Sequence, residues 1–139
     1  MKMIRNQVID PLFPQCPVRN VLSRIGDRWS LLVLLALHDK AEAMRFSDLC
    51  KAIPDVSQKM LTSTLRKLEA DDLLSRTIYP EVPPRVEYKL TKRGKTLIPL
   101  LNLLVDWSLN NMDAIMRHRE KYALPQIRNY APNMIQKRK

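Results

Sequence analysis

The sequence predicts a mainly α-helical fold that carries one small β-hairpin. Much of the chain between residues 17 and 116 has apolar residues at three- and four-residue spacing, which is typical of amphipathic helices. Two short runs, 74–79 and 85–90, instead alternate and are rich in residues that favour strands. The prolines that separate these runs lie in the connecting loop, so the two runs are expected to pair as a hairpin.

The first part of the chain is expected to form two helices and a brief strand. Pro17 stands where helices often begin, and Gly26 closes this first helix. Asp27 is placed to cap a second helix over residues 29–37, which is apolar on nearly all sides and therefore central to the core. Residues 38–43 form a polar connection, and residues 44–45 a brief strand.

The middle of the chain has two helices separated by a short corner. Ser47 and Asp48 open the first helix and Pro54 ends it, and residues 54–56 have the length of a helix-turn-helix corner. Ser57 is a favoured N-cap for the second helix. One arc of that helix is apolar or small: Met60, Leu61, Thr64, Leu65 and Leu68. The opposite arc is polar: Gln58, Lys59, Thr62, Ser63 and Arg66. With the hairpin that follows, the order of elements predicts a winged helix-turn-helix.

A long final helix follows, capped by Thr91 and bent slightly by Pro99. It carries more apolar surface than a domain of this size can cover, so we expect it to be a dimerisation helix in a symmetric homodimer. The alternative is that it folds back over its own core. The domains are then an N-terminal arm over 1–15, a winged helix domain with dimerisation helices over 16–124, and a basic, loosely ordered tail over 125–139.

The charge balance favours a polyanionic partner. The formal net charge is +10 and the pI is about 10.0. Residues 85–95 contain five basic residues against one acidic residue, and residues from 117 onward contain seven against one. A solvated face that keeps the protein soluble would explain one such run, whereas a surplus of this size beside a recognition-type helix favours nucleic acid. We find no signal-peptide core or membrane segment and expect a cytoplasmic protein.

Catalytic and metal sites are not expected. The chain has two cysteines without metal-binding or redox-motif spacing, two isolated histidines and two glycines, too few for a nucleotide-binding loop. No cofactor is expected. A thiol enzyme that uses Cys16 would lack a visible partner that activates the nucleophile. A non-specific architectural or RNA-binding protein would leave the patterned helix and wing unexplained.

The predicted DNA contacts lie on the second helix of the corner and on the wing. The DNA-binding residues of the helix are Ser57, Gln58, Lys59, Thr62, Ser63 and Arg66, and those of the wing are Tyr79, Arg85 and Lys89. We expect Gln58, Thr62, Ser63 and Arg66 to contact bases, because amide, hydroxyl and guanidinium groups match base edges. Lys59 is better placed for phosphate, Arg85 for the minor groove, and Tyr79 and Lys89 for support of phosphate contacts. The alternative for Thr62 and Ser63 is that they only face solvent.

Cys16 is the candidate for regulatory chemistry. It directly precedes Pro17 at the positive end of the first helix, where a thiolate is stabilised, and Arg19 adds a nearby positive charge. The alternative is a small packing residue that senses nothing. Cys50 is expected to be a core residue, with pairing to an oxidised Cys16 in the other subunit as the second possibility. Trp29 and Trp107 are expected to be core residues, with a ligand cavity as the alternative.

The chain resembles the HxlR-type transcriptional regulators, a branch of the MarR-like winged helices. The resemblance rests on CPVRNVLSRIGDRWSLLVL, on FSDLCKAIPDVSQKMLTSTLRKLEADDLL, on YPEVPPRVEYKLTKRG and on the Leu/Trp-rich last helix. Asp55, in the corner, and Asp72, at the end of the helix that follows it, stand where this family often has glycine. Asp27-Arg28 replaces a frequent Gly-Lys.

This resemblance implies a bacterial dimeric repressor or activator that binds a palindromic operator as double-stranded DNA. Many such regulators sense oxidants or electrophiles through a cysteine at the place of Cys16, and others respond to different signals. A regulator that answers to a small-molecule ligand without a redox role is therefore the alternative. In a compact dimer the half-sites should lie on the order of 10 base pairs apart.

Overall fold

The computed structural model describes the backbone of residues 17–135 and the side chains of residues 17–125. The elements in chain order are α2 (Pro17–Ile25), α3 (Arg28–Lys40), β1 (Met44–Arg45), α4 (Phe46–Ala52), α5 (Gln58–Ala70), β2 (Leu74–Tyr79), β3 (Arg85–Leu90) and α6 (Lys92–Ile135). The chain divides after Leu101 into two compact units, so that α6 begins in the first unit and forms the described part of the second. The arm over 1–15 and Cys16 lie outside the described residues.

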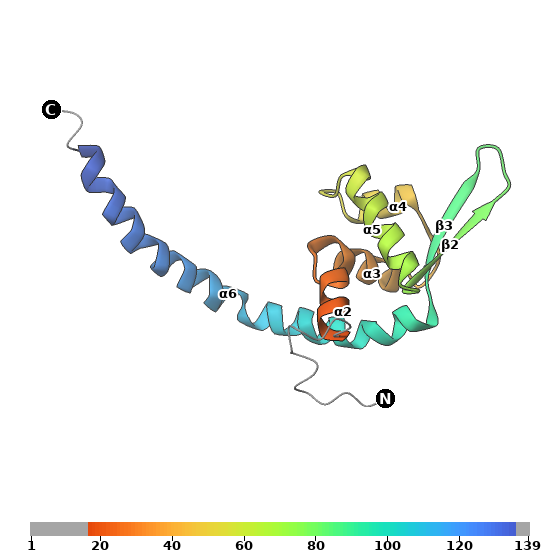
Figure 1. Cartoon of the computed structure of the whole chain (residues 1–139), viewed down its shortest axis with the longest axis horizontal. Coiled ribbons are helices and arrows are strands. Elements are labelled where there is room, and N and C mark those ends of the chain that lie inside the picture. Colours follow the sequence, from red (N-terminus) through yellow and green to blue (C-terminus); the bar gives the residue numbers. More distant parts are fainter. Residues whose placement is uncertain (1–16, 136–139) are drawn as a thin grey trace. The chain divides into compact units, whose positions relative to one another are not determined.

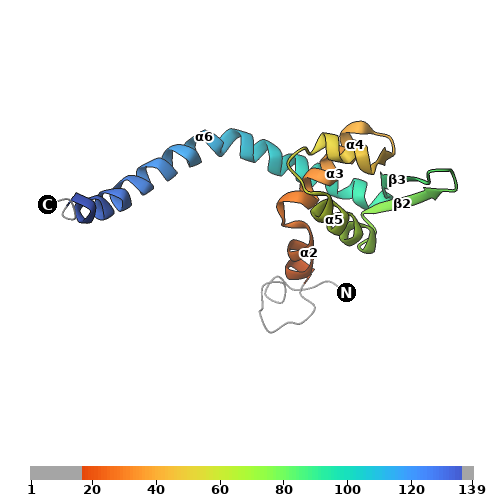
Figure 2. The same ribbon diagram turned by 90° about the horizontal axis from the view of Figure 1, so that it is seen from above.

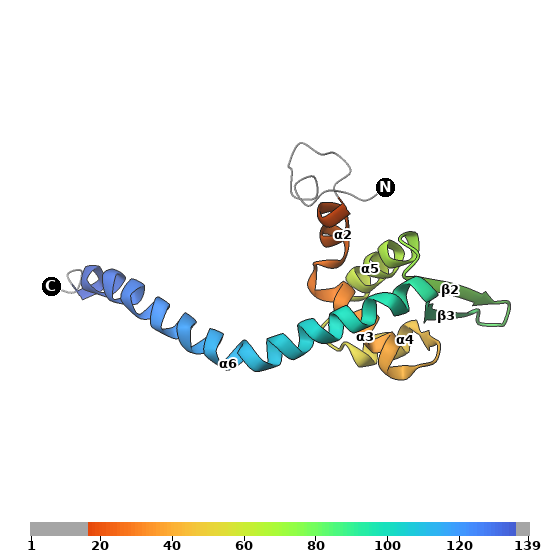
Figure 3. The ribbon, with the colours of Figure 1, turned by 90° about the horizontal axis from the view of Figure 1, so that it is seen from below.

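The first unit is a winged helix-turn-helix, as the sequence predicts. Its antiparallel sheet has the order β1-β3-β2, and β2 and β3 form the hairpin of the wing (Figure 1). Figures 2 and 3 show from above and from below that α3, α4 and α5 gather near the base of this hairpin. The brief strand at Met44–Arg45 is confirmed, and it pairs with β3.

The core lies between α3, α4, α5 and the base of the sheet. Its largest fully buried apolar side chains are Val33, Leu34, Leu49, Leu61, Leu65, Leu68 and Leu74. Ile98 and Leu101 at the start of α6 complete this core. Helix α3 is central to the core, as expected from its nearly continuous apolar composition, because it has neighbours on several sides.

Three of the predicted helix starts, at Asp27, Ser57 and Thr91, are confirmed by capping hydrogen bonds. The Asp27 carboxylate accepts hydrogen bonds from the Trp29 and Ser30 main-chain N–H groups, both at 2.8 Å. The Ser57 hydroxyl accepts from the Met60 N–H at 3.1 Å, and the Thr91 hydroxyl accepts from the Gly94 N–H at 3.0 Å. Each cap satisfies a donor that the first turn of a helix leaves open.

Some element ends differ from the predicted ones. Helix α3 continues to Lys40, where Ala41 in a left-handed conformation (φ 55°) ends it, so the polar connection is shorter than expected. Helix α4 begins at Phe46, and Asp48 lies in its first turn and accepts a hydrogen bond from the Arg45 N–H at 3.0 Å. Polar residues are tolerated inside the exposed ends of helices, so the polar composition of these segments did not mark the boundaries.

The turn after α5 begins beyond Ala70. The helix ends at Ala70, and Asp72 adopts a left-handed conformation (φ 58°) in the turn before β2. Aspartate tolerates this conformation better than most side chains because its short polar side chain can bond locally. Asp72 thus performs the role for which glycine is common at this place.

The final helix is longer than predicted. It reaches Ile135 and includes Pro125, whereas the sequence predicts that a loosely ordered tail begins at residue 125. A proline removes one main-chain hydrogen bond and favours a bend, and here the helix continues past that position. Many of its large apolar side chains are exposed: Leu100, Leu103, Leu104, Val105, Trp107, Leu109, Met112, Met116 and Leu124. None of the helices over the described residues is long and apolar enough to cross a membrane.

Gly94 provides a test of the packing between the start of α6 and the chain before β2. A Cβ atom at this position would overlap the Leu73 carbonyl oxygen and lie 3.3 Å from Leu90 Cδ2. Although alanine favours helices over glycine by about 1 kcal/mol, overpacking of this kind costs about 1–3 kcal/mol. We expect Gly94→Ala to lower the free energy of unfolding measured in urea, while Lys95→Ala, an exposed neighbour, changes it little. A stabilised Gly94→Ala protein would contradict this packing.

Candidate nucleic-acid interface

Helix α5 presents a polar side to the surface of the first unit. Leu61, Leu65 and Leu68 are buried in the core, which fixes how the helix is rotated about its axis. The predicted contact residues Gln58, Lys59, Ser63 and Arg66 are consequently exposed. Met60, which was predicted to face the core, is 44% exposed and lies at the margin between the two sides.

The residues of this surface differ in how far their polar groups are already engaged. The Ser57 hydroxyl caps the helix, and the half-buried Thr62 donates its hydroxyl hydrogen to the Gln58 carbonyl oxygen at 2.8 Å. Among the described residues, the side chains of Gln58, Ser63 and Arg66 make no hydrogen bond within the protein. These three side chains are therefore available to an external partner.

The wing has two different faces. Its strand register pairs Tyr79 with Arg85 and Ser75 with Lys89, and side chains alternate between faces along each strand. The three predicted wing residues, Tyr79, Arg85 and Lys89, therefore share one face. The buried residues Leu74 and Leu90 lie on the other, so the predicted residues lie on the face turned away from the core.

Arg85 is held by its own hairpin. Its guanidinium lies 4.1 Å from the centre of the Tyr79 ring, a cation–π contact. Its Nη2 atom is 3.3 Å from a Glu81 carboxylate oxygen, and its Nε atom is 3.5 Å from Glu87. The buried Nε atom pairs with Glu87 by charge alone, because it makes no hydrogen bond. A contact between Arg85 and DNA would require phosphates or base edges to replace these carboxylates.

The face of the wing that carries Leu74 and Leu90 forms a crevice with α5 that the sequence did not predict. Its volume is about 460 Å³, and it is lined by Thr62, Leu65, Arg66, Glu69, Ala70, Arg76 and Tyr88. The register places Arg76 directly opposite Tyr88, and Arg76 Nε lies 3.3 Å from a Glu69 carboxylate oxygen. The predicted pairing of the two strands brings Arg76 and Tyr88 to the same part of the hairpin, but their contact with α5 depends on the folded structure.

Burial in this crevice raises the pKa of the Tyr88 hydroxyl. Burial and the Glu69 charge raise the pKa of Tyr88, while the positive charges of Arg76 and Arg66 lower it; the net shift is upward. A phenol with a raised pKa remains a hydrogen-bond donor at neutral pH.

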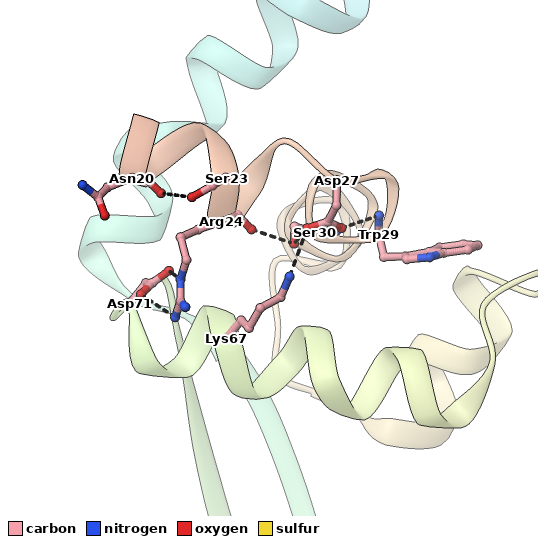
Figure 4. A network of polar contacts seen from close by, with 8 residues as sticks. All are labelled: Asn20, Ser23, Arg24, Asp27, Trp29, Ser30, Lys67 and Asp71. Carbon is pink, nitrogen blue, oxygen red and sulfur yellow. Dashed lines mark hydrogen bonds and ion pairs between the residues drawn. The ribbon is translucent and has the colours of Figure 1, made fainter. Parts of the chain in front are cut away.

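A polar network ties the C-terminal half of α5 to α2 and α3 (Figure 4). Arg24 of α2 donates two hydrogen bonds to Asp71, at 2.8 and 3.0 Å. Lys67 of α5 lies 3.4 Å from the Asp27 carboxylate, which also accepts the Ser30 hydroxyl at 2.6 Å. These two ion pairs help to fix the orientation of α5, which is also held by apolar packing.

The other residues of interest have less defined roles. Cys50 is a half-buried free thiol against the core, as a packing residue would be, while Cys16 lies outside the described residues. Trp29 packs against the core of the first unit, as expected. The expectation that Trp107 is a core residue is wrong for the single chain, because this side chain in the second unit is 57% exposed. Across the part of the chain with described side chains, no group of three His, Cys, Asp or Glu residues could hold a metal ion.

The fold and this surface define a winged helix-turn-helix protein of the DNA-binding type. Residues 24–116 match the model of the HxlR-like helix-turn-helix family. The HTH-type transcriptional regulator YtfH of Escherichia coli (strain K12) is 42% identical over 109 residues, which are 78% of this chain and 85% of that protein. The chain therefore belongs to the HxlR-like family and is a transcriptional regulator of the HxlR/MarR type.

Solved structures agree with this assignment. The structure of the transcriptional regulator ytfH from Salmonella typhimurium superposes with a TM-score of 0.68 at 43% identity, and it covers 76% of this chain and 93% of that one. The redox regulator HypR in its reduced form gives a TM-score of 0.65 at 37% identity, over 71% of this chain and 96% of that one.

The Asp27 cap gives a pH-dependent prediction. Burial would raise the pKa of Asp27, but hydrogen bonds from Ser30 and Trp29 and the Lys67 charge outweigh it and lower the pKa below its ordinary value. The stability that the carboxylate contributes is thus fully present above the unfolded-state pKa and is lost as the pH falls through the lower folded-state pKa.

We therefore expect Asp27→Ala to cost about 1–2 kcal/mol of unfolding free energy at pH 7, the usual range for a lost N-cap. Asp39→Ala, an exposed aspartate of the same helix, should cost less than about 0.5 kcal/mol. The difference between wild type and Asp27→Ala should shrink below about pH 4, near the ordinary aspartate pKa. A difference that is constant from pH 7 to pH 3 in denaturant titrations would contradict the role of the charge.

Proposed function

We propose that the protein is a sequence-specific, dimeric DNA-binding regulator whose helix α5 reads bases in the major groove. The observation that carries this proposal is the exposed polar side of α5, on which the side chains of Gln58, Ser63 and Arg66 make no hydrogen bond within the described part of the chain. An exposed helix beside a wing matches the way this fold class docks on duplex DNA. DNA as the partner also implies action in the cytoplasm.

The chemistry of each side chain suggests its role. Gln58 can pair with adenine in two hydrogen bonds, and Arg66 can do the same with guanine. Ser63 can donate or accept. Thr62 is less available, because its hydroxyl is engaged with the Gln58 carbonyl oxygen. Lys59 is assigned to phosphate, which positions the protein without specifying sequence.

The wing is assigned a supporting role. Arg85 would reach the minor groove by exchanging Glu81 and Glu87 for DNA, with the Tyr79 ring continuing to support its guanidinium. Lys89 is exposed and would add a phosphate contact. The net charge of +10 favours this mode of binding through release of counterions from the DNA.

Dimerisation is proposed through α6, because exposed apolar side chains on this helix need a cover. Leu103, Trp107 and Leu109 are 66%, 57% and 74% exposed within the second unit. Exposed apolar surface of this extent usually marks a protein interface, and a second copy is the commonest partner. A two-fold dimer would match a palindromic operator.

Arg66 and Lys59 should respond differently to substitution. We expect Arg66→Ala to weaken binding to a selected genomic duplex by about 1–3 kcal/mol per lost base contact and to relax its preference for that duplex. Lys59→Ala should weaken binding to selected and random duplexes alike and lower the salt slope by about one per contact. Fluorescence anisotropy at several salt concentrations measures both. An equal loss on all sequences after Arg66→Ala would contradict base reading.

We further propose that Cys16 senses oxidants or electrophiles. Two observations support this: Cys16 directly precedes α2, whose N-terminus would stabilise a thiolate, and the chain is similar to the redox regulator HypR. Arg24 at the end of α2 pairs with Asp71 beside α5, which gives a physical route from the first helix to the DNA-reading helix. Pairing of Cys16 with Cys50 of the other subunit is a second possibility, and an effector ligand without redox chemistry is the alternative.

Oxidation by diamide separates these alternatives. We expect diamide to release the wild-type protein from its operator and to leave a Cys16→Ser protein bound, because serine cannot form a disulfide. Cys50→Ser should behave as wild type if Cys50 only packs, and as Cys16→Ser if the two cysteines pair. The sensor role is wrong if Cys16→Ser loses DNA as readily as wild type in gel-shift titrations with diamide.

A further inference from the structure

The crevice between α5 and the wing brings positively charged groups of two elements together. Arg66 comes from α5, and Arg76 and Tyr88 from opposite positions of β2 and β3. Glu69 is the acidic residue that lines this crevice. Arg76 is paired with it at 3.3 Å, whereas Arg66 makes no ion pair with another described residue. The crevice therefore has an excess of positive charge.

The donors in this crevice suit a singly charged phosphate diester. Guanidinium groups donate in a fork that matches phosphate oxygens, and a phenol adds a neutral donor. A phenol is already protonated at neutral pH, and burial raises the pKa of Tyr88 further, so this donor stays neutral. The side chains of Arg76 and Glu69 are 44% and 38% exposed, so an incoming anion can reach the pair.

The position of the crevice suggests which phosphate it would meet. When a recognition helix lies in the major groove and a wing reaches the neighbouring minor groove, the DNA backbone that separates the grooves passes between them. The crevice lies between these two elements of the protein, on the wing face that carries Arg76 and Tyr88.

We propose that this crevice binds a DNA backbone phosphate, with Arg76 and Tyr88 as its ligands and Glu69 as the group that holds Arg76 in place when DNA is absent. The proposal rests on the proposed function, because it assigns further residues to the same DNA surface. When DNA binds, the phosphate replaces Glu69 as the partner of the Arg76 guanidinium and lies close to the Glu69 carboxylate. Glu69 therefore organises the free protein and opposes the bound phosphate.

The test uses the full-length protein with Arg76→Ala, Tyr88→Phe and Glu69→Gln, and Lys40→Ala as a control cation outside the crevice. Binding to the operator duplex and to a random duplex is measured by fluorescence anisotropy at KCl concentrations between about 50 and 300 mM. Affinity that depends on phosphate contacts falls steeply over about this range. Thermal unfolding confirms that each variant is folded, as expected for an exposed ion pair of small stabilising effect.

We expect Arg76→Ala to weaken binding to both duplexes by a similar factor, on the order of tenfold per phosphate contact. The salt slope should become shallower by about 0.9 per phosphate, or roughly 2 for a dimer on a full site. Tyr88→Phe should weaken binding to both duplexes by a few-fold without changing the salt slope, since it removes no charge. Glu69→Gln should tighten binding to both, and Lys40→Ala should leave affinity nearly unchanged.

An unchanged salt slope with Arg76→Ala overturns the proposal, as does a loss confined to the operator, which would indicate base reading. Weaker binding after Glu69→Gln also overturns it, because the carboxylate would then act only as a support. Failure of the proposed function looks different: the wild-type protein would bind operator and random duplex equally. The random duplex alone still measures the phosphate contact, so the two failures are distinguishable.

Discussion

The candidate DNA-binding surface depends on the burial of one side of α5. Leu61, Leu65 and Leu68 are almost completely enclosed, so the helix cannot rotate without exposing them to water, at a cost of about 1.5–3 kcal/mol each. This constraint alone turns Gln58, Ser63 and Arg66 outward. The polar side of α5 follows from its apolar side, and the family assignment agrees with the surface that results.

Two ion pairs add a second constraint at the C-terminal half of α5. Arg24 with Asp71 and Lys67 with Asp27 join this half to α2 and α3, while the N-terminal half is held by the Ser57 cap and the corner after α4. Asp27 acts twice, since it caps α3 and also faces Lys67. A single carboxylate thereby couples the start of one core helix to the position of another.

Much of the fold could be predicted from the sequence, because its signals are local. Prolines and alternation marked β2 and β3 at their observed bounds, and Asp27, Ser57 and Thr91 marked helix starts through short-range caps. The sequence did not show that α6 passes Pro125, because a proline lowers helix stability without dictating where a helix ends. Tertiary contacts decided the rest: the Arg76–Tyr88 crevice needs the strand register, and the pairing of Arg85 with Glu81 needs the folded hairpin.

The central claim is that α5 enters the major groove, and protection of guanine N7 atoms from dimethyl sulfate tests it most directly, because N7 is exposed only in that groove. We predict protection in two successive major grooves about 10 base pairs apart, as a two-fold dimer requires. Hydroxyl-radical protection of the DNA backbone without any N7 protection would contradict the account.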